Sequence, residues 1–270
     1  MSGGGLVARY AVIELVLRQG SFAADVAMTK AAGIDGIGVA PAPLDAVGVD
    51  EARRILDGEG VHVSSYLGGG VILQGDGLRE PLDDTARRLD AAAALGAPAA
   101  LVVTGPLGGL RPSDADAICR EWLGGAAALA LERGIRIMLE PIHPIMRHLS
   151  FVHTLGHGLT LVDGIDGAGI VLDVGHVWWE PGLDVLVRDH VADIVSVQLT
   201  NVDASALADC RYERSQLDSG DVPVASLISL LESAGYHGWY EYEVLVRTPR
   251  DERLDLVRAA REWFESQVGR

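Results

Sequence analysis

Eight short apolar runs, each followed by a longer stretch with a helical pattern, are the feature of this chain that most restricts its fold. The runs cover residues 8–15, 34–39, 61–66, 99–103, 135–140, 168–173, 194–198 and 239–243. The helical stretches cover residues 22–32, 46–57, 83–95, 113–133, 151–162, 183–189, 223–234 and 251–268. Strands that alternate with helices form parallel sheets, and eight such units favour a closed barrel over an open sheet.

The length of the chain agrees with one such barrel. The chain has 270 residues, of which 49% are hydrophobic, and a (β/α)8 barrel takes about 250 residues in one domain. We therefore expect residues 1–270 to form a single (β/α)8 TIM barrel of the α/β class. The alternative is an open Rossmann-like sheet, but no Gly-x-Gly-x-x-Gly loop follows the first run. The glycine triplets 3–5 and 68–70 are expected to be a tail and a loop.

Charge and composition exclude several classes of function. The net charge of −16 repels a phosphate backbone, so we expect no nucleic-acid partner. Apolar runs such as 91–103 are shorter than the roughly 20 residues that a membrane span needs. Residues 1–21 lack the basic region and cleavage site of a secretory signal, so a cytoplasmic location is expected. The spacing of Cys119 and Cys210 indicates free thiols.

Four polar residues end the last four apolar runs: Glu140, Asp173, Gln198 and Glu243. In a parallel barrel the carboxyl ends of the strands form the functional face, so these side chains are expected to meet there. Buried carboxylates that converge repel each other, and a cation between them is the simplest resolution. Oxygen ligands suit hard ions, so we expect one divalent metal ion, Mn²⁺ first, with Mg²⁺, Co²⁺ and Zn²⁺ as alternatives.

Three segments carry a resemblance to a known family. They are Leu-Glu-Pro-Ile-His-Pro at 139–144, Leu-Asp-Val-Gly-His-Val-Trp-Trp at 172–179 and Gly-Tyr-His-Gly-Trp-Tyr-Glu-Tyr-Glu at 235–243. The chain resembles the sugar phosphate isomerase/epimerase family, the xylose isomerase-like TIM barrels, over nearly its whole length.

The resemblance implies roles for particular residues. Glu140, Asp173, Gln198 and Glu243 match the family's metal ligands, and Glu140 and Glu243 match the two glutamates that shuttle a proton. On the seventh strand many members carry a His followed three residues later by an Asp, whereas this chain has Gln198 and Asn201. Hydroxypyruvate isomerase-like members resemble it in using Gln.

Other residues near these motifs are candidates for contact with a substrate. His143 could hydrogen-bond a hydroxyl or act as a second base, and His176 resembles the family's substrate-contacting histidine. Trp178 and Trp179 could stack on a sugar ring or pack against the barrel rim. Glu241 faces the same way as Glu243, and we expect it to lie one layer deeper or to face a neighbouring charge.

Two arginines and two histidines stand further along the loops. Arg214 is a candidate substrate contact because Arg211 and Arg214 could bind a carboxylate or phosphate. The favoured alternative for both is pairing on the surface with Asp209, Glu213 or Asp218. The spacing of His153 and His157 suits zinc, but no third ligand is apparent. No Gly-rich turn follows the eighth run, so a substrate without phosphate is expected.

These observations together predict an enzyme. The leading hypothesis is a metal-dependent isomerase or epimerase of a sugar or small keto acid, which removes a proton beside a carbonyl through an enediolate. One alternative is a lyase that performs β-elimination on a 3-keto glycoside, as in C-glycoside deglycosidase subunits, with His143 as base. Another is a non-catalytic binding barrel. The expected partners are a carbohydrate-like small molecule and either further copies of the chain or a small partner subunit.

Overall fold

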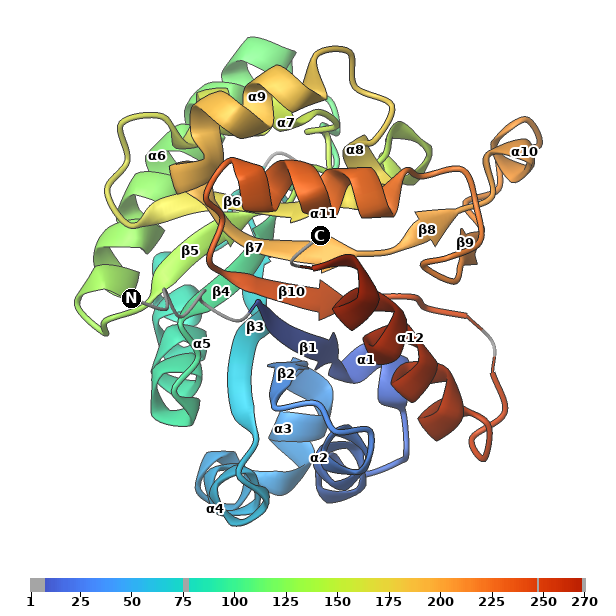
Figure 1. Ribbon diagram of the computed structural model, residues 1–270. Coiled ribbons are helices and arrows are strands. Elements are labelled where there is room, and N and C mark those ends of the chain that lie inside the picture. The colour runs from blue at the N-terminus through green and yellow to red at the C-terminus, as the bar shows by residue number, and fades with distance from the viewer. Residues whose placement is uncertain (1–7, 75–77, 247, 269–270) are drawn as a thin grey trace, which may run out of the picture.

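Eight parallel strands form a closed barrel in the computed structural model, which describes residues 8–74, 78–246 and 248–268 (Figure 1). The strands are β1 (Arg9–Ile13), β2 (Gly36–Val39), β3 (His62–Val71), β4 (Ala99–Val103), β5 (Arg136–Leu139), β6 (Ala168–Asp173), β7 (Ile194–Leu199) and β10 (Trp239–Tyr242). The last strand, β10, closes the barrel by pairing in parallel with β1. The predicted (β/α)8 barrel is therefore confirmed.

Helices form a layer around the barrel (Figure 1). The longer ones are α2 (Phe22–Ala31), α4 (Val49–Glu59), α5 (Leu82–Leu95), α6 (Pro112–Leu131), α7 (Leu155–Val162), α9 (Leu183–His190), α11 (Val224–Ser233) and α12 (Arg253–Gln267). The shorter ones are α1 (Glu14–Leu17), α3 (Pro41–Val47), α8 (Val174–Val177), α10 (Ala204–Leu207), and the 3-10 turns η1 (Pro144–Met146) and η2 (Val191–Asp193). Within the described segments no helix has the length and apolarity needed to cross a bilayer.

The third strand is longer than predicted because the second glycine triplet belongs to it. Gly69 lies so close to β4 that an added Cβ would stand 2.5 Å from the carbonyl oxygen of Leu101. A glycine permits this approach of one backbone to another, and the strand continues through it. The prediction of a loop at 68–70 is therefore wrong. The triplet at 3–5 lies outside the described residues.

Three other boundaries differ from the predicted ones. The first run was expected to stay extended to residue 15, but it ends at Ile13 and α1 begins at Glu14. The helix predicted at 46–57 is two helices, because Gly48 has a φ of +80° and separates α3 from α4. The helix predicted at 151–162 begins only at Leu155, since the Thr154 side chain caps it by accepting from the amide of His157 at 3.2 Å.

A hairpin that the sequence did not indicate follows β7. Its strands are β8 (Asn201–Val202) and β9 (Arg214–Ser215), which pair antiparallel beyond the carboxyl end of β7 (Figure 1). The Asn201 side chain donates to the carbonyls of Leu217 (3.1 Å) and Val222 (3.2 Å). It also accepts from the amides of Val202 (2.9 Å) and Val222 (2.8 Å). Asn201 therefore fixes the base of the hairpin.

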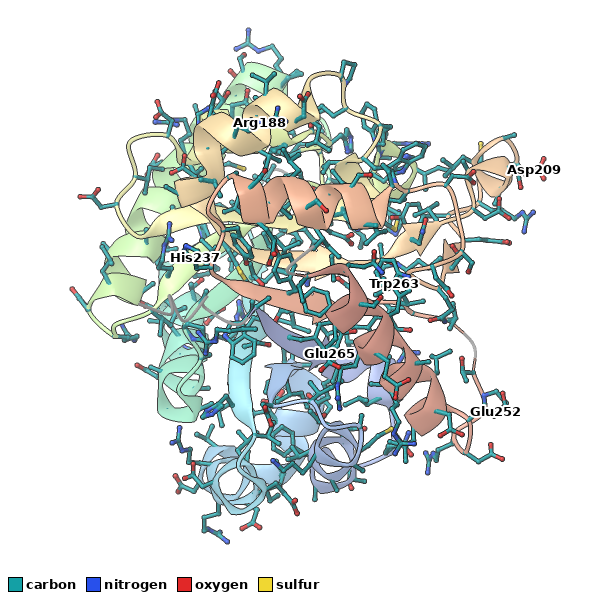
Figure 2. The ribbon with its side chains drawn as sticks, in the orientation of Figure 1. Arg188, Asp209, His237, Glu252, Trp263 and Glu265 are labelled. Atoms are coloured by element: carbon teal, nitrogen blue, oxygen red, sulfur yellow. The ribbon has the colours of Figure 1, made fainter. Side chains whose placement is uncertain are left out.

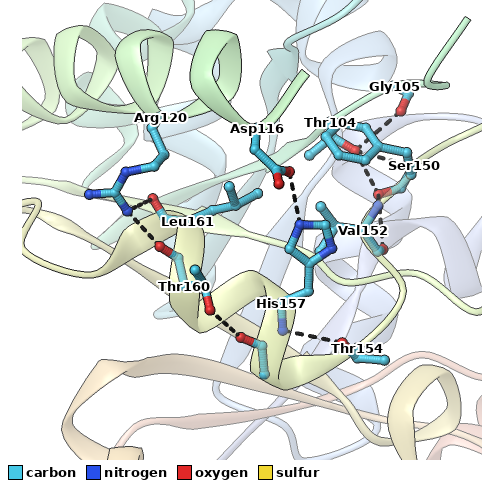
Figure 3. A network of polar contacts seen from close by, with 12 residues as sticks. Thr104, Gly105, Asp116, Arg120, Ser150, Val152, Thr154, His157, Thr160 and Leu161 are labelled. Atoms are coloured by element: carbon cyan, nitrogen blue, oxygen red, sulfur yellow. Dashed lines mark hydrogen bonds and ion pairs between the residues drawn. The ribbon is translucent and has the colours of Figure 1, made fainter. Parts of the chain in front are cut away.

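Polar contacts fix α7 against α6 (Figure 3). His157 Nε2 lies 2.9 Å from Asp116 Oδ1, and Arg120 donates to the carbonyl oxygen of Leu161 at 3.1 Å. His153 Nδ1 instead lies 2.8 Å from a backbone carbonyl. The two histidines with zinc-like spacing thus have separate structural partners.

Glu14 is a buried acid at the carboxyl end of β1. Its side chain accepts from the amide of Ala40 at 2.9 Å, while its other oxygen has no hydrogen-bond partner. Burial is the main cause that raises the pKa of Glu14, to about 7. Between pH 4.5 and about pH 7, the folded chain therefore keeps a proton on Glu14 that the unfolded chain has already lost.

This proton makes stability depend on pH. Between the ordinary pKa of 4.5 and the folded value of about 7, the free energy of unfolding falls as the pH rises, because the folded state binds more protons. The Gln side chain of Glu14→Gln does not titrate. From pH 4 to pH 8 the free energy of unfolding of the wild type should therefore fall by about 3 kcal/mol more than that of the variant. Urea unfolding at several pH values measures this difference. Parallel pH profiles for the two proteins would contradict it.

Candidate active site

The carboxyl ends of β5, β6, β7 and β10 carry the four predicted metal ligands. Asp173 and Gln198 are opposite each other in the paired strands β6 and β7. Glu140 and Glu243 follow their strands by one residue, and their amides still donate to the neighbouring strands at 3.0 and 2.9 Å. All four residues are buried, with at most 8% of their surface exposed.

Three of these residues each present one buried oxygen without a hydrogen-bond partner. The atoms are Asp173 Oδ2, Gln198 Oε1 and Glu243 Oε2. The second carboxylate oxygens are engaged, because Asp173 Oδ1 accepts from the amide of Gly175 at 2.8 Å and Glu243 Oε1 lies 3.3 Å from Arg214 Nη1. Leaving a buried polar atom unsatisfied costs about 1–3 kcal/mol. The donor set therefore fits a hard divalent cation.

A histidine also approaches two of the acids. Glu140, Asp173 and His176 each offer a ligand atom within 4.8 Å of the others. His176 Nε2 lies 3.6 Å from Glu140 Oε1 and 3.3 Å from Asp173 Oδ2. His176 was expected to contact the substrate. The structure places it beside two acids that could hold a metal.

The electrostatics of the site favour a cation. Burial, followed by the carboxylates of Glu243 and Asp173, raises the pKa of Glu140 well above its ordinary value. Burial also raises the pKa of Asp173 to about 6 and that of Glu243 to about 7, although Arg214 opposes both shifts. The single positive charge of Arg214 thus does not balance the negative charge of three buried carboxylates, and an added cation would balance the rest.

Arg214 is part of this site. Its side chain is 10% exposed, and Nη2 lies 3.7 Å from Asp173 Oδ2. It also donates to the backbone carbonyl of Glu243. The expected surface pairing is therefore wrong for Arg214 but right for Arg211, which lies 3.6 Å from Asp209. Asp209 is at the outer tip of the loop, away from the barrel (Figure 2).

Three aromatic rings form one wall beside the acids. The ring centroid of Tyr212 lies 5.4 Å from that of His143 and 5.2 Å from that of His176. Burial lowers the pKa of His143, and burial lowers that of His176 well below its ordinary value, so both rings favour the neutral form. Tyr212 was not predicted. The one feature of the sequence that could have indicated Tyr212 is its position two residues before Arg214, a candidate substrate contact.

The two tryptophans after Asp173 have different surroundings. Trp179 is 36% exposed, its ring lies 5.9 Å from that of His143, and its Nε1 donates to the carbonyl oxygen of His176 at 2.9 Å. Trp178 packs against the main hydrophobic core, and its indole Nε1 is buried without a hydrogen-bond partner. Packing accounts for the ring of Trp178 but not for its nitrogen, whereas Trp179 stands beside a candidate substrate contact.

Glu241 lies one layer below the site, as expected. It is fully buried, and the hydroxyls of Ser64 and Ser65 each donate to its Oε1 at 2.6 Å. Ser196 donates to its Oε2 at 3.0 Å. Because both oxygens of Glu241 are occupied by hydroxyls, Glu243 rather than Glu241 has an oxygen free for a metal.

Comparisons with known proteins agree with the fold. The sequence model of the xylose isomerase-like TIM barrel family matches residues 26–267. The protein SMc04130 from Sinorhizobium meliloti 1021 is 25% identical, with a TM-score of 0.83 over 96% of this chain and 98% of that chain. A comparison with curated protein sequences gave no match.

Two further solved structures have the same fold at lower identity. The IOLI protein with a bound zinc atom is 14% identical, with a TM-score of 0.81 over 96% of this chain and 98% of that chain. D-psicose 3-epimerase from Clostridium cellulolyticum H10, solved with D-tagatose, is 14% identical, with a TM-score of 0.79 over 96% and 99%. Together with the family match, the barrel and its acidic strand ends lead to one conclusion: this chain belongs to the xylose isomerase-like TIM barrel family.

Proposed function

We propose that the protein is a divalent-metal-dependent isomerase or epimerase of a small sugar without phosphate. The observation that carries this proposal is the set of unpartnered buried oxygens on Asp173, Gln198 and Glu243. His176 and Arg214 approach Asp173 Oδ2 to 3.3 and 3.7 Å without forming a hydrogen bond, and packing gives no reason to leave three such acceptors unsatisfied at the ends of adjacent strands. Together with Glu140, they supply the all-oxygen ligand set that Mn²⁺ and Mg²⁺ prefer.

Glu140 and Glu243 are the proposed acid and base. A divalent cation held by these ligands would act as a Lewis acid on the substrate carbonyl. One glutamate removes the proton from the carbon beside that carbonyl, and the other returns a proton to the neighbouring carbon or the opposite face. The pKa of Glu243 is raised to about 7 by burial, and a pKa near the working pH suits a group that both takes and gives a proton.

Arg214 supports a substrate without phosphate. Its two terminal nitrogens already face Asp173 at 3.7 Å and Glu243 at 3.3 Å. His143 and His176 favour the neutral form because they are buried. Among the described residues of the site, no cation is therefore left for a phosphate or a free carboxylate. An uncharged polyhydroxyl compound, such as the D-tagatose in the psicose epimerase structure, fits this charge pattern.

The test begins with the metal. Wild type and Asp173→Ala are dialysed against chelator, reloaded with manganese and analysed for bound metal, with Asp116→Ala as the control because Asp116 pairs with His157 outside the barrel. We expect one manganese per chain in wild type and control, and none in Asp173→Ala. Manganese-loaded wild type should then exchange the proton beside the carbonyl of D-tagatose, D-psicose or L-ribulose in D₂O, followed by NMR. No specific metal in wild type would contradict the proposal.

A second candidate, β-elimination from a 3-keto glycoside, uses the same acids with His143 as the base. The observation in its favour is that burial lowers the pKa of His143, which keeps the imidazole neutral and able to accept a proton. Release of an aglycone from a 3-keto glycoside, tested with and without a small partner subunit, distinguishes this lyase from an isomerase.

A further inference from the structure

We infer that the Tyr212 hydroxyl donates a hydrogen bond to an oxygen of the bound substrate. This inference rests on the proposed function and adds a residue that the family motifs in the sequence did not indicate. Tyr212 lies in the loop between β8 and β9, far in sequence from the strand ends that carry the acids. The fold nevertheless brings its ring against two histidines of the site.

The hydroxyl of Tyr212 is buried and has no hydrogen-bond partner. Its position is given by Gly175, where an added Cβ would lie 3.0 Å from the Tyr212 oxygen and 3.3 Å from Asp173 Oδ1. The hydroxyl and the acid that ends β6 thus both border Gly175, and, after burial, Asp173 is the charged group that raises the pKa of Tyr212 most. An unsatisfied buried hydroxyl costs about 1–3 kcal/mol, and a donor aimed at a ligand recovers that cost when the ligand binds.

The ring of Tyr212 is held in place from three sides. Its centroid is 5.2 Å from that of His176 and 5.4 Å from that of His143, and Arg214 Cζ lies 5.8 Å from it. Asn201 fixes the base of the hairpin through four hydrogen bonds to backbone groups. A donor held this firmly is suited to orient a substrate, because little conformational freedom remains to be lost on binding.

The nearby acceptors do not satisfy this hydroxyl within the protein. Glu243 Oε1 faces Arg214, and Asp173 Oδ1 accepts from the amide of Gly175. Asp173 Oδ2, Glu243 Oε2 and the Glu140 carboxylate are assigned to the metal, and none of them forms a hydrogen bond with Tyr212. A substrate oxygen is therefore the acceptor that would complete the hydrogen bonding of Tyr212 in the working site.

Tyr212→Phe tests this inference, because it removes the hydroxyl and keeps the ring between the histidines. The matched control is Tyr10→Phe, since the Tyr10 hydroxyl is also buried and unpartnered but its ring stacks on Phe264 of α12, outside the barrel. Manganese-loaded proteins are compared for proton exchange of D-tagatose, D-psicose and L-ribulose in D₂O. For Tyr212→Phe we expect kcat/KM to fall by about tenfold or more, with manganese content unchanged and a melting temperature no lower than that of wild type.

The outcomes separate this inference from the proposed function. A Tyr212→Phe enzyme that matches wild type and Tyr10→Phe would overturn the inference alone, since the ring would then act only by packing. Loss of manganese from Tyr212→Phe would also overturn it, because the hydroxyl would then serve the metal site. A wild-type protein that binds manganese but neither exchanges nor binds any of the three ketoses would overturn both. A fall in kcat indicates a bond to the reacting oxygen, and a rise in KM indicates a bond to another hydroxyl; either supports the inference.

Discussion

Replacing Glu140 by Gln is expected to lower the rate of proton exchange by about 10³-fold. The amide has the shape of the carboxylate and keeps an oxygen for a metal, the same type of ligand that Gln198 offers two strands away on β7. What it loses is the ability to take and return a proton. Retention of manganese together with loss of exchange would therefore assign proton transfer, rather than metal binding, to Glu140.

The control for this variant is Glu14→Gln. Glu14 is also buried beside a strand end and also has a raised pKa, but it accepts from the amide of Ala40, and the carboxylate that influences its pKa is Asp25. Its exchange rate should stay within about twofold of wild type, as for a residue outside the reacting groups. A Glu140→Gln enzyme as active as this control would remove Glu140 from the proposed mechanism.

Replacing Arg214 by Met is expected to destabilise the metal-free protein by about 3 to 5 kcal/mol at pH 8, because Asp173 and Glu243 would lose their buried cationic partner. The loss should shrink at pH 5, where protons neutralise the carboxylates whose pKa values burial has raised to about 6 and about 7. Manganese should restore much of the stability by binding the folded state. Urea unfolding with chelator, with manganese and at the two pH values measures each effect.

Arg211→Met is the matched control, since Arg211 lies on the same loop but pairs with Asp209 in solvent. Exposed ion pairs contribute about 0 to 1 kcal/mol, so this variant should unfold nearly as wild type does. Equal destabilisation by the two substitutions would mean that Arg214 acts through the loop and not through the acids.

The barrel and the acids were predictable because both follow periodic patterns. Eight apolar runs fix the order of the strands, and a residue at the end of a parallel strand must lie on the functional face. Glu140, Asp173, Gln198 and Glu243 are therefore buried at the ends of neighbouring strands, and the ligand atoms that lie within 4.8 Å of one another belong to Glu140, Asp173 and His176. The family resemblance fixed Glu243 rather than Glu241, and the three serine hydroxyls around Glu241 supply the physical reason.

The loop residues were harder to predict because their places depend on long-range contacts. Arg214 was expected in solvent beside acidic neighbours, but the hairpin turns its side chain to Asp173 and Glu243. Tyr212 follows the same hairpin and carries no motif of its own. The hairpin depends on Asn201, whose bonds to the backbone of Leu217 and Val222 span up to 21 residues. Local sequence patterns do not report pairings at that separation.

The hairpin after β7 divides the site into two parts with different freedom to change. The acids stand at the ends of barrel strands, and each of these strands pairs with two neighbouring strands. Tyr212 and Arg214 instead come from one hairpin that leaves the barrel after β7. Asn201 holds that hairpin through backbone groups, so the contacts do not depend on which side chains lie between them. Under the proposed function, changes in this hairpin would alter the contacts to a substrate without moving the acids that transfer the proton.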